Sequence, residues 1–142
     1  MAKATVTEAL PAPLGDVWKL IRDFGDLSAW APGANVTKLE GEGVGMIRHI
    51  EGGDAGYFKE QCEAHDDENH TFGYTLLISP GPIEDYHAEV RLTETGPDAC
   101  EIEWSSVFRH GGVPEEEIVK GVEDTYRIFI ESLKNTIRSK GV

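Results

Sequence analysis

The sequence predicts an α+β fold in which helices cover one face of an antiparallel sheet. A strand pattern opens the 142-residue chain, and a long helical pattern from Pro114 to Arg138 closes it. Between Asn35 and His110, six segments with strand character are separated by short turn-forming clusters. Because strands joined by short hairpins run antiparallel, these six and the first strand predict a seven-stranded antiparallel sheet.

The N-terminal part combines one strand with two short helices. The strand runs from Ala4 to Leu10 and ends where Pro11 interrupts the chain. From Leu14 to Phe24 the apolar residues recur on one side of a helix. A second short helix is expected at about Asp26 to Trp30, before a Pro-Gly pair.

The six later strands are delimited by turn residues. Gly, Pro, Asp and Asn gather at five places, which are residues 40–43, 52–56, 66–69, 79–82 and 95–98. Each cluster lies between runs that are richer in β-branched and aromatic residues. Each therefore predicts a hairpin.

The long helix carries its own start and stop signals. Pro114 suits a first helical turn, and the glutamates at 115–117 follow where the helix dipole favours negative charge. Gly141 can end the helix. Apolar residues recur every three or four positions, so one stripe faces the sheet. We expect Gly121 and Thr125 on that stripe, where small side chains leave room for a ligand or else allow close packing against bulky neighbours.

Composition narrows the possible partners. The chain has 26 acidic and 13 basic residues and a net charge of −13. Because nucleic acids and anionic membrane surfaces are bound by basic patches, we expect neither as a partner. No apolar run reaches transmembrane length and no signal peptide follows Met1, so we expect one cytoplasmic domain over residues 1–142, without membrane insertion, as a monomer or weak homodimer.

The two cysteines, Cys62 and Cys100, have no metal-binding or disulfide-framework spacing. We expect both thiols to be reduced, with Cys62 facing the interior. We expect no metal site and no cofactor. The histidines fall on separate strands or in turns, with His49, His65 and His87 facing outward, and no calcium-loop or phosphate-loop spacing occurs.

Side-chain alternation along the strands predicts which residues face the helix. Around the turn at residues 52–56, a symmetric hairpin pairs Arg48 with Glu60 on the mostly apolar inner face. Extending the pairing across the later hairpins gives one inward layer, formed by Arg48, Glu60, Leu76, Ala88 and Ser106. The sequence therefore predicts a cation and a carboxylate side by side in an apolar interior.

Short segments distributed over the whole chain carry a family resemblance. They are Asp16-Val17-Trp18, Asp23-Phe24, Trp30, Gly43-Val44-Gly45-Met46-Ile47-Arg48, Lys59-Glu60-Gln61, Asp66-Asp67 and Glu101-Ile102-Glu103-Trp104-Ser105. These segments resemble the START-like, helix-grip superfamily (SRPBCC), which includes the polyketide cyclase/dehydrase proteins. The resemblance implies a strongly curved seven-stranded sheet that grips the long C-terminal helix, and an internal cavity that opens near the loops.

Two branches of this superfamily are similar around the predicted pair. In the lachrymatory factor synthases, a catalytic arginine and glutamate match Arg48 and Glu60. In the abscisic acid receptors, a ligand-contacting glutamate and tyrosine match Glu60 and Tyr86. The chain lacks the lysine with which those receptors meet the ligand carboxylate, and residues 51–55 and 79–85 do not reproduce their closing loops. Neither branch therefore defines the ligand.

The Arg48–Glu60 pair has two interpretations. If a ligand shares the pair, Glu60 can exchange a proton with a bound carbonyl or enol while Arg48 stabilises the developing oxyanion. That chemistry suits aldol cyclisation, dehydration or tautomerisation of a small apolar oxygenated molecule. In the alternative, the two side chains form a structural ion pair that fills a gap in the sheet.

Ten further residues are candidates for the cavity lining, either as ligand contacts or as ordinary core. They are Tyr74, Leu76, Tyr86, Ala88, Trp104, Ser106, Phe108, Gly121, Thr125 and Phe129. Two functions remain open at this point. One is a cofactor-free enzyme of the polyketide cyclase/dehydrase kind, and the other is a non-catalytic carrier or sensor for a small hydrophobic ligand.

Overall fold

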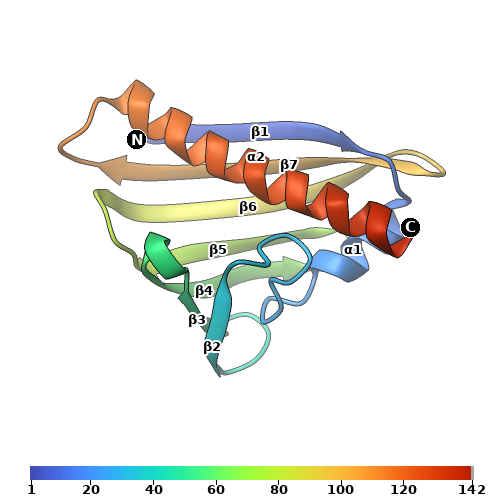
Figure 1. Cartoon of the computed structure of the whole chain (residues 1–142), viewed down its shortest axis with the longest axis horizontal. Helices are drawn as coiled ribbons and strands as arrows, with labels where there is room; N and C mark the ends of the chain where they lie inside the picture. Colours follow the sequence, from blue (N-terminus) through green and yellow to red (C-terminus); the bar gives the residue numbers. More distant parts are fainter. Residues whose placement is uncertain (142) are drawn as a thin grey trace.

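The computed structural model describes residues 1–141 and has a strongly curved sheet that wraps around a long C-terminal helix (Figure 1). Its elements, in chain order, are β1 (Ala2–Leu10), α1 (Leu14–Ile21), β2 (Asn35–Glu40), β3 (Ile47–Glu51), a 3₁₀ turn η1 (Gly53–Ala55), β4 (Tyr57–Asp66), β5 (Thr71–Ile78), β6 (Ile83–Gly96), β7 (Ala99–His110) and α2 (Glu115–Lys140). The predicted α+β class, with seven strands and a long C-terminal helix, is confirmed.

The seven strands form one antiparallel sheet in the order β1-β7-β6-β5-β4-β3-β2. Glu60 lies opposite both Arg48 and Leu76, and Ala88 lies opposite Ser106, as predicted. The predicted pairing of Leu76 with Ala88 is wrong, because Ala88 lies opposite Tyr74. The predicted pairing of Leu76 with Ala88 requires a hairpin centred on Pro82, whereas the observed register centres it on Gly81. Gly81 adopts a φ of 111°, which a proline cannot reach.

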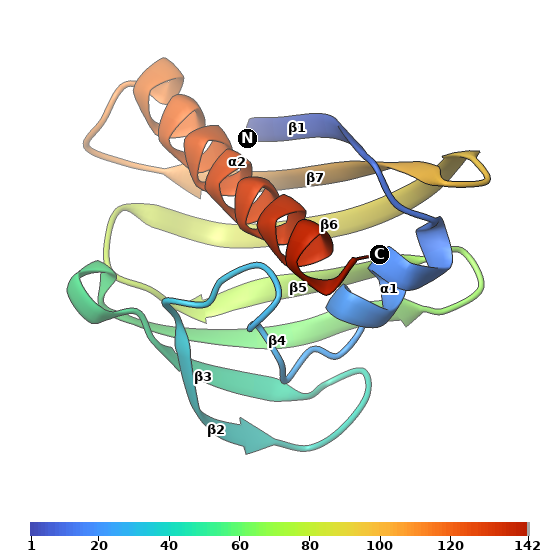
Figure 2. The same cartoon turned by 45° about the vertical axis from the view of Figure 1, so that its right-hand side comes forward.

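Helix α2 runs diagonally across the concave face of the sheet, over β1, β7 and β6 (Figures 1 and 2). Polar contacts with β1 hold it at one point in each half of the helix: Glu123 accepts the Thr5 N–H at 3.1 Å, and Lys134 lies 2.6 Å from Glu8. It begins after Pro114 and ends at Gly141, where φ is 70°. Its buried stripe is formed by Tyr126, Ile130, Leu133 and Ile137.

Residues 22–34 form consecutive turns where the sequence predicted a second short helix. The Trp30 and Ala31 N–H groups both donate to the Leu27 carbonyl, but no further helical turn follows. The Asp23 and Asp26 carboxylates accept backbone N–H groups two residues further on, at 2.9 Å each. Such local bonds compete with helical ones. This turn segment packs beside α2, where Thr136 donates to the Ala29 carbonyl at 2.7 Å.

A β-bulge between Cys62 and Ala64 reverses the alternation of β4. Beyond the bulge, His65 lies opposite Phe72, which is buried. The His65 ring lies 5.6 Å from the Trp18 ring of α1, so the prediction that His65 faces outward is wrong. The alternation of apolar and polar residues in the sequence does not reveal an extra residue in one strand of a pair.

Both cysteines are buried and free. Cys62 lies on β4 opposite Tyr74, and Cys100 lies on β7. Strands β5 and β6 separate β4 from β7 in the sheet. The two cysteines lie in separate parts of the sheet, and Cys62 is buried as predicted; that both thiols are reduced stays a prediction.

Candidate functional site

An internal cavity of about 620 Å³ lies between α2, the turn segment and strands β3 to β6. This volume is typical of small-molecule binding sites. Among the described residues 1–141 that line it, Glu60 is the only charged one. The apolar wall is formed by Leu27, Trp30, Ala31, Pro32, Ala34, Ile50, Phe58, Leu76, Ile83, Val122, Ile128 and Phe129.

The cavity opens to solvent beside α2. Ile128 lines the cavity although its side chain is 65% exposed, and Thr125, one turn earlier, is exposed as well. Thr125 Oγ1 donates back to the Gly121 carbonyl at 3.0 Å, so its hydroxyl is used within the helix. Exposed Ala55, in η1, also lines the cavity. The opening therefore lies between α2 and η1.

The buried end of the cavity is marked by the predicted Arg48–Glu60 pair. Arg48 Nε lies 2.8 Å and Arg48 Nη2 2.7 Å from Glu60 Oε1. The Nε contact is a well-aligned hydrogen bond, whereas Nη2 approaches at an angle that forms none. Glu60 Oε2 has no hydrogen-bond partner within residues 1–141 and belongs to a side chain that is 13% exposed. One carboxylate oxygen is thus held by the protein, and the other is available to a ligand.

Arg48 itself lies behind Glu60 rather than in the cavity. Its side chain is 1% exposed and is absent from the lining. Nη1 donates to the Phe24 carbonyl at 2.9 Å, and the guanidinium carbon lies 3.8 Å from the centre of the Phe24 ring. The rings of Trp30 and Tyr74 lie 5.6 and 5.1 Å away. The three rings enclose the guanidinium through cation–π contacts, so Arg48 contacts Glu60 but does not line the cavity.

Three tyrosine hydroxyls surround the same end of the cavity. Tyr86 and Tyr126 are joined through their hydroxyls, and Tyr126 donates to Ser106 Oγ at 2.7 Å. Tyr74 Oη accepts the indole N–H of Trp104 at 3.1 Å. Burial, with a smaller contribution from the charge of Glu60, raises the pKa of Tyr74 and Tyr86 well above that of an ordinary phenol and the pKa of Tyr126 to about 12. The three phenols therefore remain protonated and act as hydrogen-bonding groups.

Six of the predicted site residues line the cavity. They are Glu60, Tyr74, Leu76, Tyr86, Thr125 and Phe129. Arg48, Ala88, Trp104, Ser106, Phe108 and Gly121 do not. The Tyr126 ring stacks on Trp104 at 5.5 Å and bonds Ser106, and the Tyr86 ring lies 6.1 Å from Phe108. The two tyrosines therefore contact three of the inner sheet residues that were expected to line the cavity.

The position of the helix stripe explains the error at Gly121. Gly121 is exposed, and Val122 and Tyr126 face the cavity instead. Adjacent helix positions differ by about 100° in direction, so an assignment one residue early turns a lining residue outward. Val122 and Tyr126 are four residues apart and belong to the apolar periodicity that predicted the stripe. The turn segment gave no comparable signal, because irregular segments show no periodicity.

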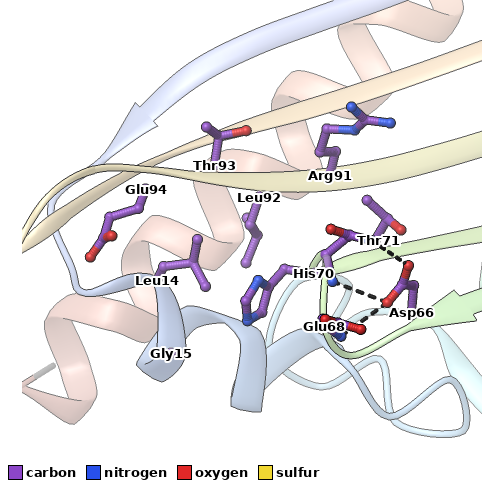
Figure 3. A pocket seen from close by; sticks show the side chains of 11 residues that line it. Leu14, Gly15, Asp66, Glu68, His70, Thr71, Arg91, Leu92, Thr93 and Glu94 are labelled. Carbon is purple, nitrogen blue, oxygen red and sulfur yellow. Dashed lines mark hydrogen bonds between the residues drawn. The ribbon is translucent and has the colours of Figure 1, made fainter.

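A second hollow, of about 890 Å³, lies on the outside of the molecule at the start of α1 (Figure 3). Its residues include Asp66, Glu68, Arg91 and Glu94, and Figure 3 shows the Asp66 carboxylate turned toward its own β4–β5 hairpin. That carboxylate accepts the N–H groups of Glu68 and Asn69 at 3.0 Å each. The Asp66 carboxylate is therefore engaged within its own hairpin rather than in the hollow.

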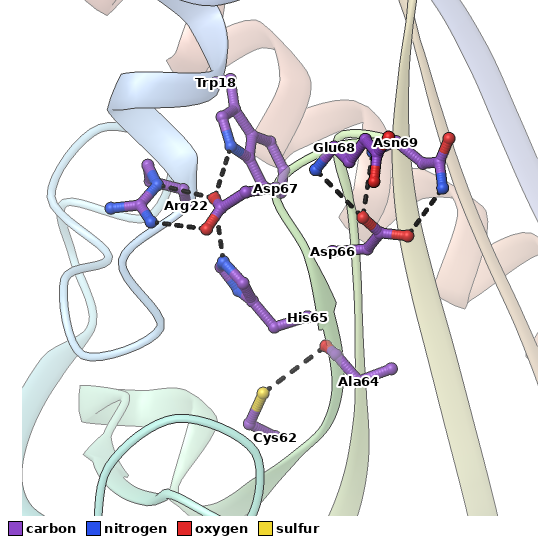
Figure 4. Close-up of polar contacts among 9 residues, drawn as sticks. All are labelled: Trp18, Arg22, Cys62, Ala64, His65, Asp66, Asp67, Glu68 and Asn69. Carbon is purple, nitrogen blue, oxygen red and sulfur yellow. Dashed lines mark hydrogen bonds and ion pairs between the residues drawn. The ribbon is translucent and has the colours of Figure 1, made fainter.

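The end of β4 is tied to α1 by Asp67 (Figure 4). One oxygen of Asp67 accepts Trp18 Nε1 and Arg22 Nε, and the other accepts Arg22 Nη2, at 2.9 Å each. His65 Nε2 lies 3.1 Å from the first oxygen. These bonds, first of all that from Arg22, hold the pKa of Asp67 well below its usual range. The cluster is a structural joint that closes one end of the sheet on α1.

The chain is similar to known proteins over almost its whole length. The sequence profile of the family described as polyketide cyclase / dehydrase and lipid transport matches residues 1–138. The protein XoxI from Bacillus cereus is similar over 100% of this chain and 99% of its own, with 23% identity and a TM-score of 0.87. A protein from Nitrosospira multiformis is 26% identical over 94% of each chain, with a TM-score of 0.76. A START superfamily protein from Mycobacterium smegmatis, 14% identical over 98% of this chain and 99% of its own, gives a TM-score of 0.77.

These neighbours support the helix-grip architecture expected from the sequence resemblance. Within residues 1–141, no helix is long and apolar enough to cross a bilayer.

Proposed function

Because the chain belongs to the polyketide cyclase / dehydrase and lipid transport family, we propose that it binds a small hydrophobic molecule in the internal cavity and exchanges a proton with it through Glu60. The observation that supports this most strongly is the position of Glu60. It is the only charged residue among the described lining residues of an otherwise apolar cavity. An enzyme that moves protons on an apolar molecule needs one carboxylate within reach and few competing polar groups.

The proton transfer that we propose is an enolisation. Glu60 Oε2 takes a proton from the carbon next to a ligand carbonyl, and the electrons of that C–H bond form a C=C bond as the carbonyl oxygen gains negative charge. The Tyr74 hydroxyl, whose oxygen accepts from Trp104, has its own proton free to hydrogen-bond that oxygen. Return of the proton from Glu60 to the enolate oxygen gives the enol. In a ligand with a C=C bond next to the deprotonated carbon, return of the proton to the far end of the conjugated enolate shifts the double bond.

Arg48 has a different role from the one expected from sequence. It is buried behind Glu60 and does not line the cavity, so we assign it to positioning the carboxylate rather than to stabilising the oxyanion. A guanidinium that holds one oxygen and leaves the other uncovered fixes the direction in which Glu60 presents its base. The reaction then needs no group from outside the chain.

The alternative function is a non-catalytic carrier or sensor. It is supported by the family description, which includes lipid transport, and by the predominance of apolar residues in the lining. In that case Glu60 and the tyrosines only orient the ligand. The two functions predict the same binding but differ in proton exchange.

Proton exchange can be measured without knowing the natural ligand. With tetralone, a bicyclic ketone, in deuterated buffer, NMR follows loss of the protons next to the carbonyl. We expect wild-type protein to accelerate this loss and Glu60→Gln to abolish the acceleration. Glu63→Gln is the matched control, because Glu63 lies on the same strand but is about half exposed outside the cavity. Saturable binding without acceleration in the wild type would favour the carrier, and the absence of both would contradict the proposal.

A further inference from the structure

The tyrosine chain at the buried end of the cavity has a direction. Tyr126 donates to Ser106 Oγ at 2.7 Å, and a phenol has one proton to donate. In the hydrogen bond between Tyr86 and Tyr126, Tyr86 must therefore be the donor. Because the single proton of Tyr86 is committed in this way, its oxygen can only accept a hydrogen bond from a molecule in the cavity.

The other two polar groups at this end complement Tyr86. Tyr74 accepts the Trp104 N–H and keeps its own proton free, so it is a donor toward the cavity. Glu60 Oε2 has no partner within residues 1–141 and is an acceptor. The cavity thus offers acceptors at Glu60 and Tyr86 and a donor at Tyr74, all three of which line it.

The charge of the lining disfavours an anionic ligand. None of the described lining residues is a lysine or an arginine. Arg48, behind the wall, is already bound to Glu60 and to the Phe24 carbonyl. A ligand carboxylate would have to share a largely apolar cavity with the Glu60 carboxylate, without a cation of its own, which is costly.

We propose that the ligand is a neutral hydroxy ketone on an apolar ring system, whose hydroxyl donates to Tyr86 and whose carbonyl oxygen accepts from Tyr74. This inference rests on the proposed function, in which the carbon next to that carbonyl faces Glu60. Tyr86 is then a specificity-determining residue that recognises the ligand at a point away from the reacting carbon. Its contribution depends on Ser106 and Tyr126, which set the direction of the chain.

Three matched probes test the proposal by isothermal titration calorimetry at neutral pH. They are a hydroxynaphthyl methyl ketone, its methyl ether and the corresponding hydroxynaphthoic acid. We expect the hydroxy ketone to bind at least about tenfold more tightly than the ether, which cannot donate, and than the acid, which is charged. In Tyr86→Phe the preference for hydroxyl over ether should fall to within about twofold. Tyr57→Phe is the control and should keep the preference, because Tyr57 bonds His49 outside the cavity.

The wild-type series decides the question even if Tyr86→Phe does not fold. Equal binding of the ether and the hydroxy ketone, or tighter binding of the acid, would overturn the assignment of the ligand class while leaving the cavity function intact. Failure of all three probes to bind would contradict the proposed function itself. A preference that survives in folded Tyr86→Phe would remove Tyr86 from the recognition of the hydroxyl.

Discussion

Arg48 holds Glu60 by one oxygen only. The guanidinium Nε and Nη2 lie 2.8 and 2.7 Å from Oε1, and Oε2 has no partner within residues 1–141. The arginine is fully enclosed, and the glutamate lines the cavity. The pair that sequence alternation predicted is therefore asymmetric: Arg48 is enclosed, and Glu60 faces the cavity.

The first prediction concerns the energetic coupling of this pair. Arg48→Met leaves a carboxylate without its partner, and Glu60→Leu leaves a buried guanidinium, so each should cost about 3 kcal/mol of unfolding free energy. The apolar double variant should also cost no more than about 3 kcal/mol, because neither charge is then left alone. Urea unfolding of the four proteins measures the coupling.

A surface ion pair provides the control for this comparison of two single variants, the double variant and the wild type. Arg91 and Glu89 lie 3.0 Å apart with about half of each side chain exposed. Arg91→Met and Glu89→Leu should each change stability by less than about 1 kcal/mol and show almost no coupling. Additive costs at Arg48 and Glu60 would mean that the two side chains do not depend on each other, contrary to their contact here.

The second prediction concerns the joint at Asp67. Its folded-state pKa is lowered, chiefly by Arg22 and then by Trp18, below the value of about 3.9 for an unfolded aspartate. The charged carboxylate therefore stabilises the fold above that unfolded pKa, and this contribution disappears as the pH falls through the folded pKa. Asp67→Asn should have a lower melting temperature than the wild type at neutral pH. This difference in melting temperature should become smaller below about pH 4. The control Glu68→Gln, in the same hairpin, should have the melting temperature of the wild type. A difference for Asp67→Asn that does not change with pH would refute the electrostatic explanation.

The third prediction concerns the cysteines. Burial raises the pKa of Cys62 and raises that of Cys100 to about 11. Since the thiolate is the reactive form, both thiols should react slowly with a disulfide reagent in the folded protein at mildly alkaline pH. After denaturation without reductant, two thiols per chain should react at once. Rapid modification of the folded protein, or fewer than two thiols after denaturation, would conflict with the burial of both residues.

The fourth prediction concerns the buried phenols. Burial raises the pKa of Tyr126 to about 12 and those of Tyr74 and Tyr86 further above the ordinary range. Ionisation of these three tyrosines should therefore coincide with alkaline unfolding rather than precede it. Parallel titration of phenolate absorbance and circular dichroism makes the comparison, and phenolate formation by these residues in the native protein would argue against the closed hydroxyl chain.

The sequence predicted the fold well because its signals are local and repeated. Proline, glycine and glutamate mark the ends of α2, and alternation placed Arg48 opposite Glu60. The errors in strand pairing and side-chain direction arose where a shift of one residue reverses the assignment. Gly81 moved the centre of a hairpin, and the bulge after Cys62 turned His65 inward.

The candidate site was harder to predict than the fold. The predicted inner wall included small sheet residues such as Ser106, but Tyr126 bonds Ser106 and lines the cavity in its place. How far a large side chain reaches depends on tertiary packing, which periodicity does not contain. The turn segment over the cavity lacks periodicity altogether, so its part in the lining could be seen only in the folded chain.

The central claim is that the internal cavity, and not the larger surface hollow, binds the ligand. The most direct measurement is a methyl NMR titration of isotope-labelled protein with the hydroxynaphthyl methyl ketone. We predict saturable shifts at Ile50, Leu76, Ile83 and Val122, which line the cavity, and none at Leu14 and Leu92, which line the surface hollow. Shifts confined to Leu14 and Leu92, or no saturable shift at the cavity methyls, would contradict the account.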